Sequence, residues 1–177
     1  MILGLDISTS ITGATVIDDS GNVVFCEAWD TRKNKNFFDK ASLIRGRLMD
    51  VRIEFPITHI AIEQSLQMFR AGFSSAKTLT LLSKFNGVVS WLCYNTFGLE
   101  PEYVSATTAR KQAGIKVPRG SKAKAVVLQH VLDNVIGFEV QYTKHGNPKP
   151  GSYDRADSLV IAKSAYIEWS KNKKQPS

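Results

Sequence analysis

The order of the apolar segments along this 177-residue chain constrains its fold more than any other feature. Alternation of apolar and polar residues predicts four strands, over residues 2–7, 12–17, 23–29 and 57–63. Between the third and the fourth, helical spacing predicts a helix over residues 37–55, which Pro56 ends. The first three strands favour an antiparallel meander, whereas a helix between two strands favours a crossover to a parallel neighbour.

A long apolar helix is predicted next, over residues 75–97. Ser74 or Ser75 can cap its N-terminus, and Gly98 stands at the C-cap position. Its apolar residues occur on most sides of the helix. Such a helix is either buried or shared with another subunit.

The rest of the chain is mainly helical by the same criteria. A short strand over residues 102–105 precedes three further helices. They are expected from Ser105 or Thr107 to about Gly114, from a Ser121 cap to about Val135, and over residues 153–169. A polar loop occupies residues 139–152. We therefore expect one α/β domain over residues 1–170 with helices on both sides of its sheet, and a basic, disordered tail over residues 171–177.

Composition limits the partners and the compartment. The formal net charge is +7, which suits a polyanionic partner but also fits a basic solubilising surface. Cys26 and Cys93 lie in apolar runs without metal-ligand spacing, so we expect buried free thiols in a reducing compartment. Met1 leads directly into a strand and no apolar run approaches 18 residues, so neither a signal peptide nor a membrane span is expected.

Four carboxylates stand in unusual places. Asp6 and Glu63 each end an apolar strand, and crossover strands can be neighbours. Asp154 and Asp157 are three residues apart, on the helix face that also carries Ile161. The alternative is that the last two are ordinary first-turn acids that complement the helix macrodipole.

Convergence of the four acids would require cations, because four anions in one pocket repel each other. Hard oxygen ligands suit Mg²⁺ or Mn²⁺. Two such ions about 4 Å apart are the arrangement that hydrolyses phosphodiesters in line. The acids therefore predict a two-metal site.

Two further segments indicate nucleic acid. Residues 105–132 contain no Asp or Glu but carry Arg110, Lys111, Lys116, Arg119, Lys122 and Lys124. A stripe of one sign can follow a phosphate backbone, although it can also be a solvated helix face. The segment after Glu63 holds Met68, Phe69, Arg70 and Phe73. Its aromatic residues can stack on unpaired bases or simply anchor the loop in the core.

Three motifs in order resemble the RuvC-type Holliday junction resolvases. Residues 3–8, Leu-Gly-Leu-Asp-Ile-Ser, with Thr12-Gly13, are similar to their first strand and turn. Ala-Ile-Glu-Gln at residues 61–64 resembles their second catalytic motif. Tyr-Asp-Arg-Ala-Asp-Ser-Leu-Val-Ile-Ala at residues 153–162 resembles their closing helix. The spacing fits as well, so the resemblance covers nearly the whole chain.

The resemblance implies an RNase H-like fold, an α/β architecture with a mixed five-stranded sheet flanked by helices on both sides. It implies a homodimer that nicks two opposed strands of a four-way DNA junction with two Mg²⁺ ions, for which Mn²⁺ can substitute. Neither a nucleotide cofactor nor a membrane is implied. The short chain with divergent loops suggests a cytoplasmic protein of a bacterial or phage-infected cell.

The resemblance also assigns residue roles. By motif position, the metal-binding acids are Asp6, Glu63, Asp154 and Asp157. Lys111 and Lys124 fall where the family has lysines that contact DNA and support catalysis. The family has an aromatic residue a few positions after the second acid, whereas Leu66 is the third residue after Glu63 here. This departure puts junction specificity in doubt, because a relaxed branched-DNA nuclease would carry the same acids.

Other functions fit part of the pattern. A structure-specific DNA-binding protein without cleavage would carry the same basic stretch. An actin-like ATPase or sugar kinase could use residues 6–10 as a phosphate-binding hairpin, but this chain is too short for the second half that such enzymes need. A transposase is a weaker fit, because it lacks the closing Asp-x-x-Asp helix.

Overall fold

A single mixed sheet organises the molecule. The computed structural model describes residues 1–64 and 76–173. The strands are β1 (Ile2–Asp6), β2 (Ile11–Ile17), β3 (Val23–Asp30), β4 (His59–Glu63) and β5 (Glu102–Val104). The helices are α1 (Phe37–Glu54), α2 (Ala76–Phe97), α3 (Ala106–Gln112), α4 (Ala123–Asn134) and α5 (Ser152–Lys173). The strand order is β3-β2-β1-β4-β5, so the predicted five-stranded sheet is confirmed.

The direction of the strands follows from their connections. Tight turns join β1, β2 and β3, which pair antiparallel. Helix α1 carries the chain across to β4, which pairs parallel with β1, and α2 carries it to β5, which pairs parallel with β4. The predicted crossover is therefore confirmed.

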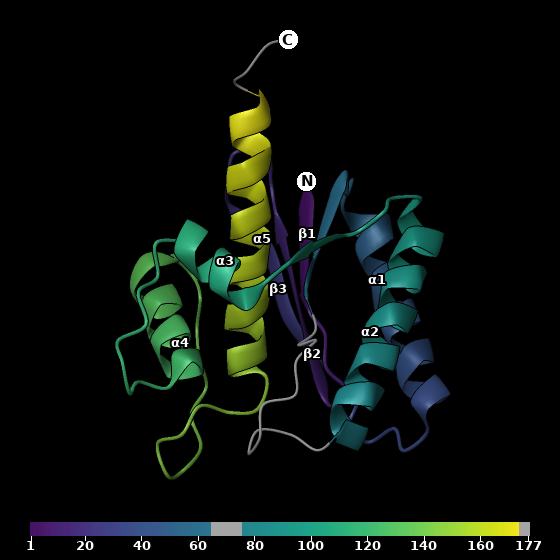
Figure 1. Ribbon diagram of the computed structural model, residues 1–177, viewed down its shortest axis with the longest axis horizontal. Coiled ribbons are helices and arrows are strands. Elements are labelled where there is room, and N and C mark those ends of the chain that lie inside the picture. Colours follow the sequence, from purple (N-terminus) through teal and green to yellow (C-terminus); the bar gives the residue numbers. More distant parts are fainter. Residues whose placement is uncertain (65–75, 174–177) are drawn as a thin grey trace.

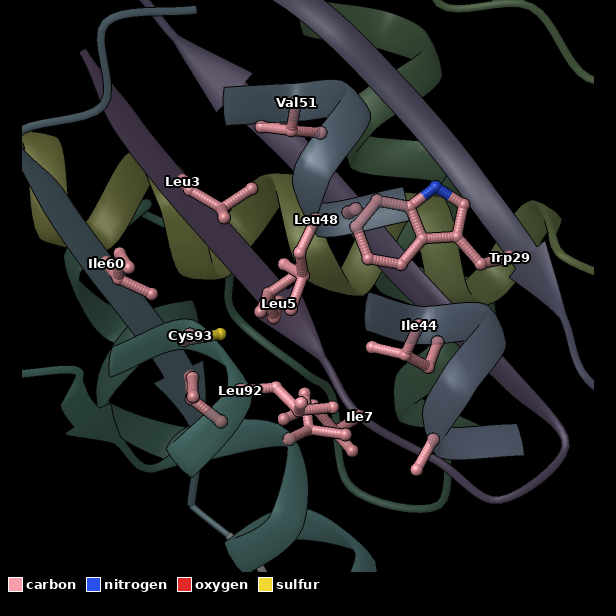
Figure 2. Packing of buried hydrophobic residues seen from close by; sticks show 14 of the residues in the cluster. Leu3, Leu5, Ile7, Trp29, Ile44, Leu48, Val51, Ile60, Leu92 and Cys93 are labelled. Carbon is pink, nitrogen blue, oxygen red and sulfur yellow. The ribbon is translucent and has the colours of Figure 1, made fainter. Parts of the chain in front are cut away.

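Helices cover both faces of the sheet (Figure 1). Helices α1 and α2 lie on one side, and α3, α4 and α5 lie on the other. On the α1 side, Leu3, Leu5 and Ile60 of the sheet belong to one buried cluster with Ile44 and Leu48 of α1 and Cys93 of α2, as Figure 2 shows. Burial of these aliphatic side chains supplies the main stabilisation of this layer, about 1.5–3 kcal/mol for each.

The opposite face is built for a close approach of α5. A Cβ atom at Gly4 would lie 2.5 Å from the backbone nitrogen of Ala162. At Gly13 it would lie 1.9 Å from the carbonyl oxygen of Asp154. The hydroxyl groups of Thr15 and Ser158 meet at 2.8 Å between the same elements. The helix therefore packs directly on the backbones of β1 and β2.

The helix ends test several local predictions, of which some are confirmed and others are wrong. Ser105 caps α3 as predicted, because its Oγ accepts from the amide of Thr108 at 3.1 Å. Ser121 does not cap α4: its amide donates to Pro118 in a turn, and Lys122 takes the N-cap position without a side-chain bond. Helix α5 continues beyond the predicted end, as far as Lys173.

Helix α2 is buried on one side only, so of the two alternatives predicted for it, full burial within this chain is wrong. Its inner face buries Phe85, Val89 and Cys93, whereas Trp91 and Tyr94 are 61% and 57% exposed. The proposed caps Ser74 and Ser75 and residues 174–177 of the predicted tail lie outside the described residues. Within the described part of the chain, no helix is long and apolar enough to cross a membrane.

We predict that Gly13→Ala lowers the free energy of unfolding by about 1–3 kcal/mol, because the added methyl group must push α5 off the sheet. Urea unfolding followed by circular dichroism measures this change. The matched control is Gly46→Ala in α1, where nothing lies within 4 Å of the new Cβ. There alanine should stabilise the helix by about 0.5–1 kcal/mol. Equal effects at the two positions would contradict the close packing of α5.

Candidate active site

Two of the predicted acids meet at one end of the sheet. Strand β1 ends at Asp6 and its parallel neighbour β4 ends at Glu63. Leu5 pairs with Ile62, so the two acids are the next residues along neighbouring strands in the same register. They alternate onto the face that α5 covers, because residues opposite each other in a sheet point to the same side.

The other two acids come from the first turns of α5. Contact with Gly13 fixes the backbone of Asp154 against β2, directly beside Asp6, which pairs with Gly13. Asp157 follows one turn later and is 18% exposed. The structure thus brings all four predicted acids to one end of the sheet.

The electrostatics show how closely these carboxylates interact. Burial, followed by repulsion from Glu63, Asp157 and Asp154, raises the pKa of Asp6 well above its ordinary value. Burial and repulsion from Asp157 raise the pKa of Glu63 to about 7. Burial also raises the pKa values of Asp154 and Asp157, and Lys124 opposes each rise. The ionised carboxylates of the cluster are therefore destabilised by burial and by their mutual repulsion.

Lys124 is the cation built into this cluster. Its Nζ lies 3.5 Å from Oδ2 of Asp157, although 62% of its side chain is exposed. Burial alone would lower its pKa, but the carboxylates of Asp157, Asp6 and Asp154 outweigh this and raise it. Of the two lysines assigned to catalysis, Lys124 contacts the acids. Lys111 instead lines a separate cavity of about 410 Å³ with Arg110 and Lys116.

Two cavities give access to the acids. The smaller, about 230 Å³, is lined by Asp6, Ser8, Glu63, Asn86, Lys124 and Asp154, among others. The larger, about 370 Å³, includes Glu63, Arg110, Lys124 and Asp157. Both share Glu63 and Lys124, so the acids line both cavities.

Ser8 and Asn86 were not anticipated from the sequence. The side chain of Asn86 donates to the carbonyl oxygen of Glu63 at 3.2 Å and so fixes the end of β4. Ser8 Oγ accepts from the amides of Ser10 and Ile11 and closes the turn that follows Asp6. The available signal for Asn86 was an amide next to Phe85 and three residues before Val89, within the apolar part of the predicted helix.

The remaining predicted DNA contacts lie around this site or beyond the described residues. Arg110 contributes a charge that opposes the raised pKa values of Glu63 and Asp157. Arg119 and Lys122 are exposed between α3 and α4. The remaining four, in the segment after Glu63, lie outside the described residues: Met68, Phe69, Arg70 and Phe73.

The donor set fits a divalent cation by its chemistry. Four carboxylates with raised pKa values offer hard oxygen ligands and negative charge that a cation would relieve. In the described part of the chain, however, no group of three or more histidine, cysteine, aspartate or glutamate side chains is arranged so that it could hold a metal ion. Holding an ion therefore requires these carboxylates to turn toward one another.

Comparison with known proteins identifies the fold. No protein-family model and no curated protein sequence matches this chain. Solved structures do match over almost its whole length. The chain superposes on RuvC of T. thermophilus in complex with a Holliday junction substrate with a TM-score of 0.68 and 15% identity, over 99% of this chain and 98% of that one.

Two further structures agree. A Thermus thermophilus RuvC structure gives a TM-score of 0.59 and 17% identity over 99% of both chains. The yeast mitochondrial Holliday junction resolvase Ydc2 gives 0.56 and 17% over 97% of this chain and 82% of that one. At such identities the likeness shows the fold alone. The predicted RNase H-like fold, of the RuvC kind, is confirmed.

We predict that the metal-free protein loses stability as pH rises from about 5 to about 8. A glutamate with an ordinary pKa of 4.5 and a folded pKa of about 7 binds its proton more tightly in the folded state. Its contribution is complete below the unfolded pKa and is lost as pH rises through about 7. The loss should be on the order of 1–3 kcal/mol, measured by urea unfolding in EDTA.

Glu63→Gln should flatten this pH dependence, whereas Glu100→Gln at an exposed position should leave it unchanged. Mg²⁺ should raise the melting temperature more at about pH 8 than at about pH 5, because ions and protons compete for the same carboxylates. Identical pH profiles for the two variants would contradict the buried acid cluster.

Proposed function

We propose that this protein is a metal-dependent endonuclease that cuts branched DNA, with the four-way junction as its substrate. The observation that carries the proposal is the gathering of Asp6, Glu63, Asp154 and Asp157, with Lys124 among them, at one end of a RuvC-like sheet. The first of the RuvC structures above is in complex with a Holliday junction substrate. Paired nicks across such a junction would resolve it.

The four acids would hold two Mg²⁺ ions, or Mn²⁺ in their place. When bound, such ions would supply Lewis-acid activation of the scissile phosphate and of the attacking water. The rigid ends of β1 and β4 orient Asp6 and Glu63, and Asn86 holds the backbone of the latter. Lys124, already drawn to the carboxylates, would stabilise the charge that develops on the phosphate.

The basic residues of α3, α4 and their connection would bind the DNA backbone. Arg110, Lys111 and Lys116 surround one cavity, and the cavity that holds Glu63 and Asp157 shares Arg110 with it. A strand bound along this side would therefore lead from the phosphate contacts to the acids. Such contacts provide affinity that depends on salt but not on sequence.

A second candidate is a junction-binding protein without cleavage. It is favoured by one observation: the described acids, as they stand, form no group that could hold a metal ion. Binding would then survive removal of the acids, and no metal would support cutting. An actin-like ATPase would instead hydrolyse ATP without cutting DNA.

We predict that the wild-type protein cuts a synthetic four-way junction in Mg²⁺ and not in EDTA. Flap, fork and linear duplex substrates are compared in the same gel assay. Asp6→Asn should lower the cleavage rate at least about 10²-fold while junction binding persists, because the ligand is removed but the basic surface is not. Asp50→Asn, at an exposed position of α1, is the control.

The outcomes separate the candidates. Equal cutting of all four substrates would reject junction specificity but retain the nuclease. An absence of cutting by the wild-type protein with either Mg²⁺ or Mn²⁺, together with intact junction binding, would leave the binding protein.

A homodimer is the assembly we propose for paired nicking. Helix α2 exposes three large apolar side chains: Leu81, Trp91 and Tyr94. Gly87 lies one turn before Trp91, with open space at its missing Cβ. Exposed aromatic residues suit a protein interface, and the glycine leaves room for a side chain of the second subunit.

We predict a species of twice 19.6 kDa in sedimentation velocity. Trp91→Glu should raise the dissociation constant at least about 10-fold, because it buries a charge in the interface. Tyr142→Glu, on an exposed loop residue, should leave the dimer intact. A wild-type monomer in the presence of junction DNA would exclude coordinated nicking by two subunits.

A further inference from the structure

The connection between β3 and α1 carries a second basic segment that the proposed site does not use. Residues 31–38 contain three cations, two aromatic residues and no acid, although Asp30 and Asp39 flank them. Arg32, Lys33, Lys35 and Phe38 are all exposed. These four residues form what we call the β3–α1 surface.

This surface lies beside the acid cluster. Asp30 at the end of β3 pairs with Ile11 of β2, and the next amide, that of Thr31, donates to the carbonyl oxygen of Ser10 at 2.9 Å. Lys40 Nζ donates to the carbonyl oxygen of Thr9 at 2.5 Å. The β3–α1 connection is thus tied to the turn that follows the first acid of the cluster.

Arg32 shows how near the cluster is. Its guanidinium is held by the carboxylate of Asp30, with Nη2 at 2.6 Å from Oδ2 and Nε at 2.9 Å from Oδ1. Its side chain remains 51% exposed. Burial raises the pKa of Asp154, and after Lys124 the charge of Arg32 opposes this rise. Arg32 is therefore close enough to the cluster for its charge to act on Asp154.

Phe38 offers a rigid aromatic face next to these cations. It is 72% exposed in the first turn of α1. Its ring meets Phe37 edge to face at 5.4 Å, and Phe37 meets the fully buried Phe85 in the same way at 5.4 Å. A chain of three rings thus supports an aromatic side chain that is largely in solvent. Such a side chain suits base stacking, which tolerates any sequence.

We propose that the β3–α1 surface is a second nucleic-acid contact, which binds an unpaired DNA strand beside the acid cluster on the α1 side of the sheet, with Phe38 stacked on one base. Helix α1 and helix α4 lie on opposite sides of the sheet (Figure 1). A strand held at both surfaces would pass over the acids between them. This inference rests on the proposed function, and it names the part of the substrate that carries unpaired bases.

Charge complementarity selects nucleic acid as the occupant. The three cations provide a phosphate track, and an exposed phenylalanine provides the stacking platform. An acidic peptide would satisfy the cations but would leave the flat ring without its matching partner. A protein ligand is therefore an outcome of the test and not the proposal.

The test measures binding of a fluorescent four-way junction and of single-stranded DNA by anisotropy, in EDTA and over a salt series. Phe38→Ala should weaken binding to single-stranded DNA about 5- to 100-fold and binding to linear duplex less than about twofold. The control is Ile53→Ala, which truncates an 81% exposed side chain in the last turn of the same helix. Phe38→Trp, which keeps an aromatic ring at this position, should bind single-stranded DNA about as tightly as the wild-type protein.

A combined Arg32→Ala, Lys33→Ala, Lys35→Ala variant should change the slope of log binding constant against log salt concentration. The magnitude of this slope should fall by about two to three, because each cation that neutralises a phosphate contributes about one to it. Its control replaces Arg52, Lys171 and Lys173 with alanine, the basic residues in the last turns of α1 and α5. Ultraviolet crosslinking of the wild-type protein to bromodeoxyuridine in the unpaired strand should label the peptide that contains Phe38.

The outcomes separate this inference from the proposed function. A wild-type protein that binds no DNA would reject both. If the wild-type protein binds junctions but both variants match their controls, or if the crosslink falls elsewhere, the β3–α1 surface is not a DNA contact and the proposed function stands. Loss of binding in both variants, with unchanged circular dichroism, supports the inference.

Discussion

The direct contact between α5 and the sheet is the constraint on which the rest of the molecule depends. Gly4 and Gly13 leave no side chain between the strands and the helix, so the backbones of β1 and β2 touch those of Ala162 and Asp154. An ordinary layer of aliphatic side chains would hold α5 several ångströms farther away. At that distance the carboxylates of α5 could not share an electrostatic environment with those at the strand ends. Two glycines thus set the short distance between α5 and the strand ends that carry the acids.

The same contact creates an electrostatic burden. Four carboxylates gathered with partial burial disfavour the folded state at neutral pH, and one lysine, itself largely exposed, compensates only part of their charge. Apolar packing on both faces of the sheet offsets this cost. On one face, aliphatic side chains of β1 and β4 pack against α1 and α2, and on the other a second buried cluster joins the sheet to α4 and α5. The folded state therefore tolerates the repulsion between the acids at one end of the sheet.

Much of this could be predicted from the sequence, because the decisive patterns are local. Strand alternation and the Pro56 boundary predicted the crossover, and the acid at each strand end predicted their meeting once β1 and β4 were neighbours. Asn86 and Arg32 could not be assigned in this way. Their roles come from interactions between elements that no periodicity encodes: Asn86 of α2 bonds the end of β4, and the charge of Arg32, just after β3, acts on Asp154 of α5. Ser121 was misassigned because a serine suits a turn as well as a cap, and Pro118 favoured the turn.

The acids lie in the middle of the sheet, and this position determines where cations beside them would be most useful. Asp6 and Glu63 belong to the two neighbouring strands β1 and β4 in the order β3-β2-β1-β4-β5. A polyanion that reaches them must therefore cross the end of the sheet and meet the helices of both layers. Basic residues on the α3–α4 side alone would attract the substrate to one half of this path, and the bare carboxylates would repel it at the centre. Under the proposed function, cations on both sides, with Lys124 among the acids, would lower that barrier along the path. The β3–α1 connection is tied to the turn after Asp6, so cations there would act close to the acids.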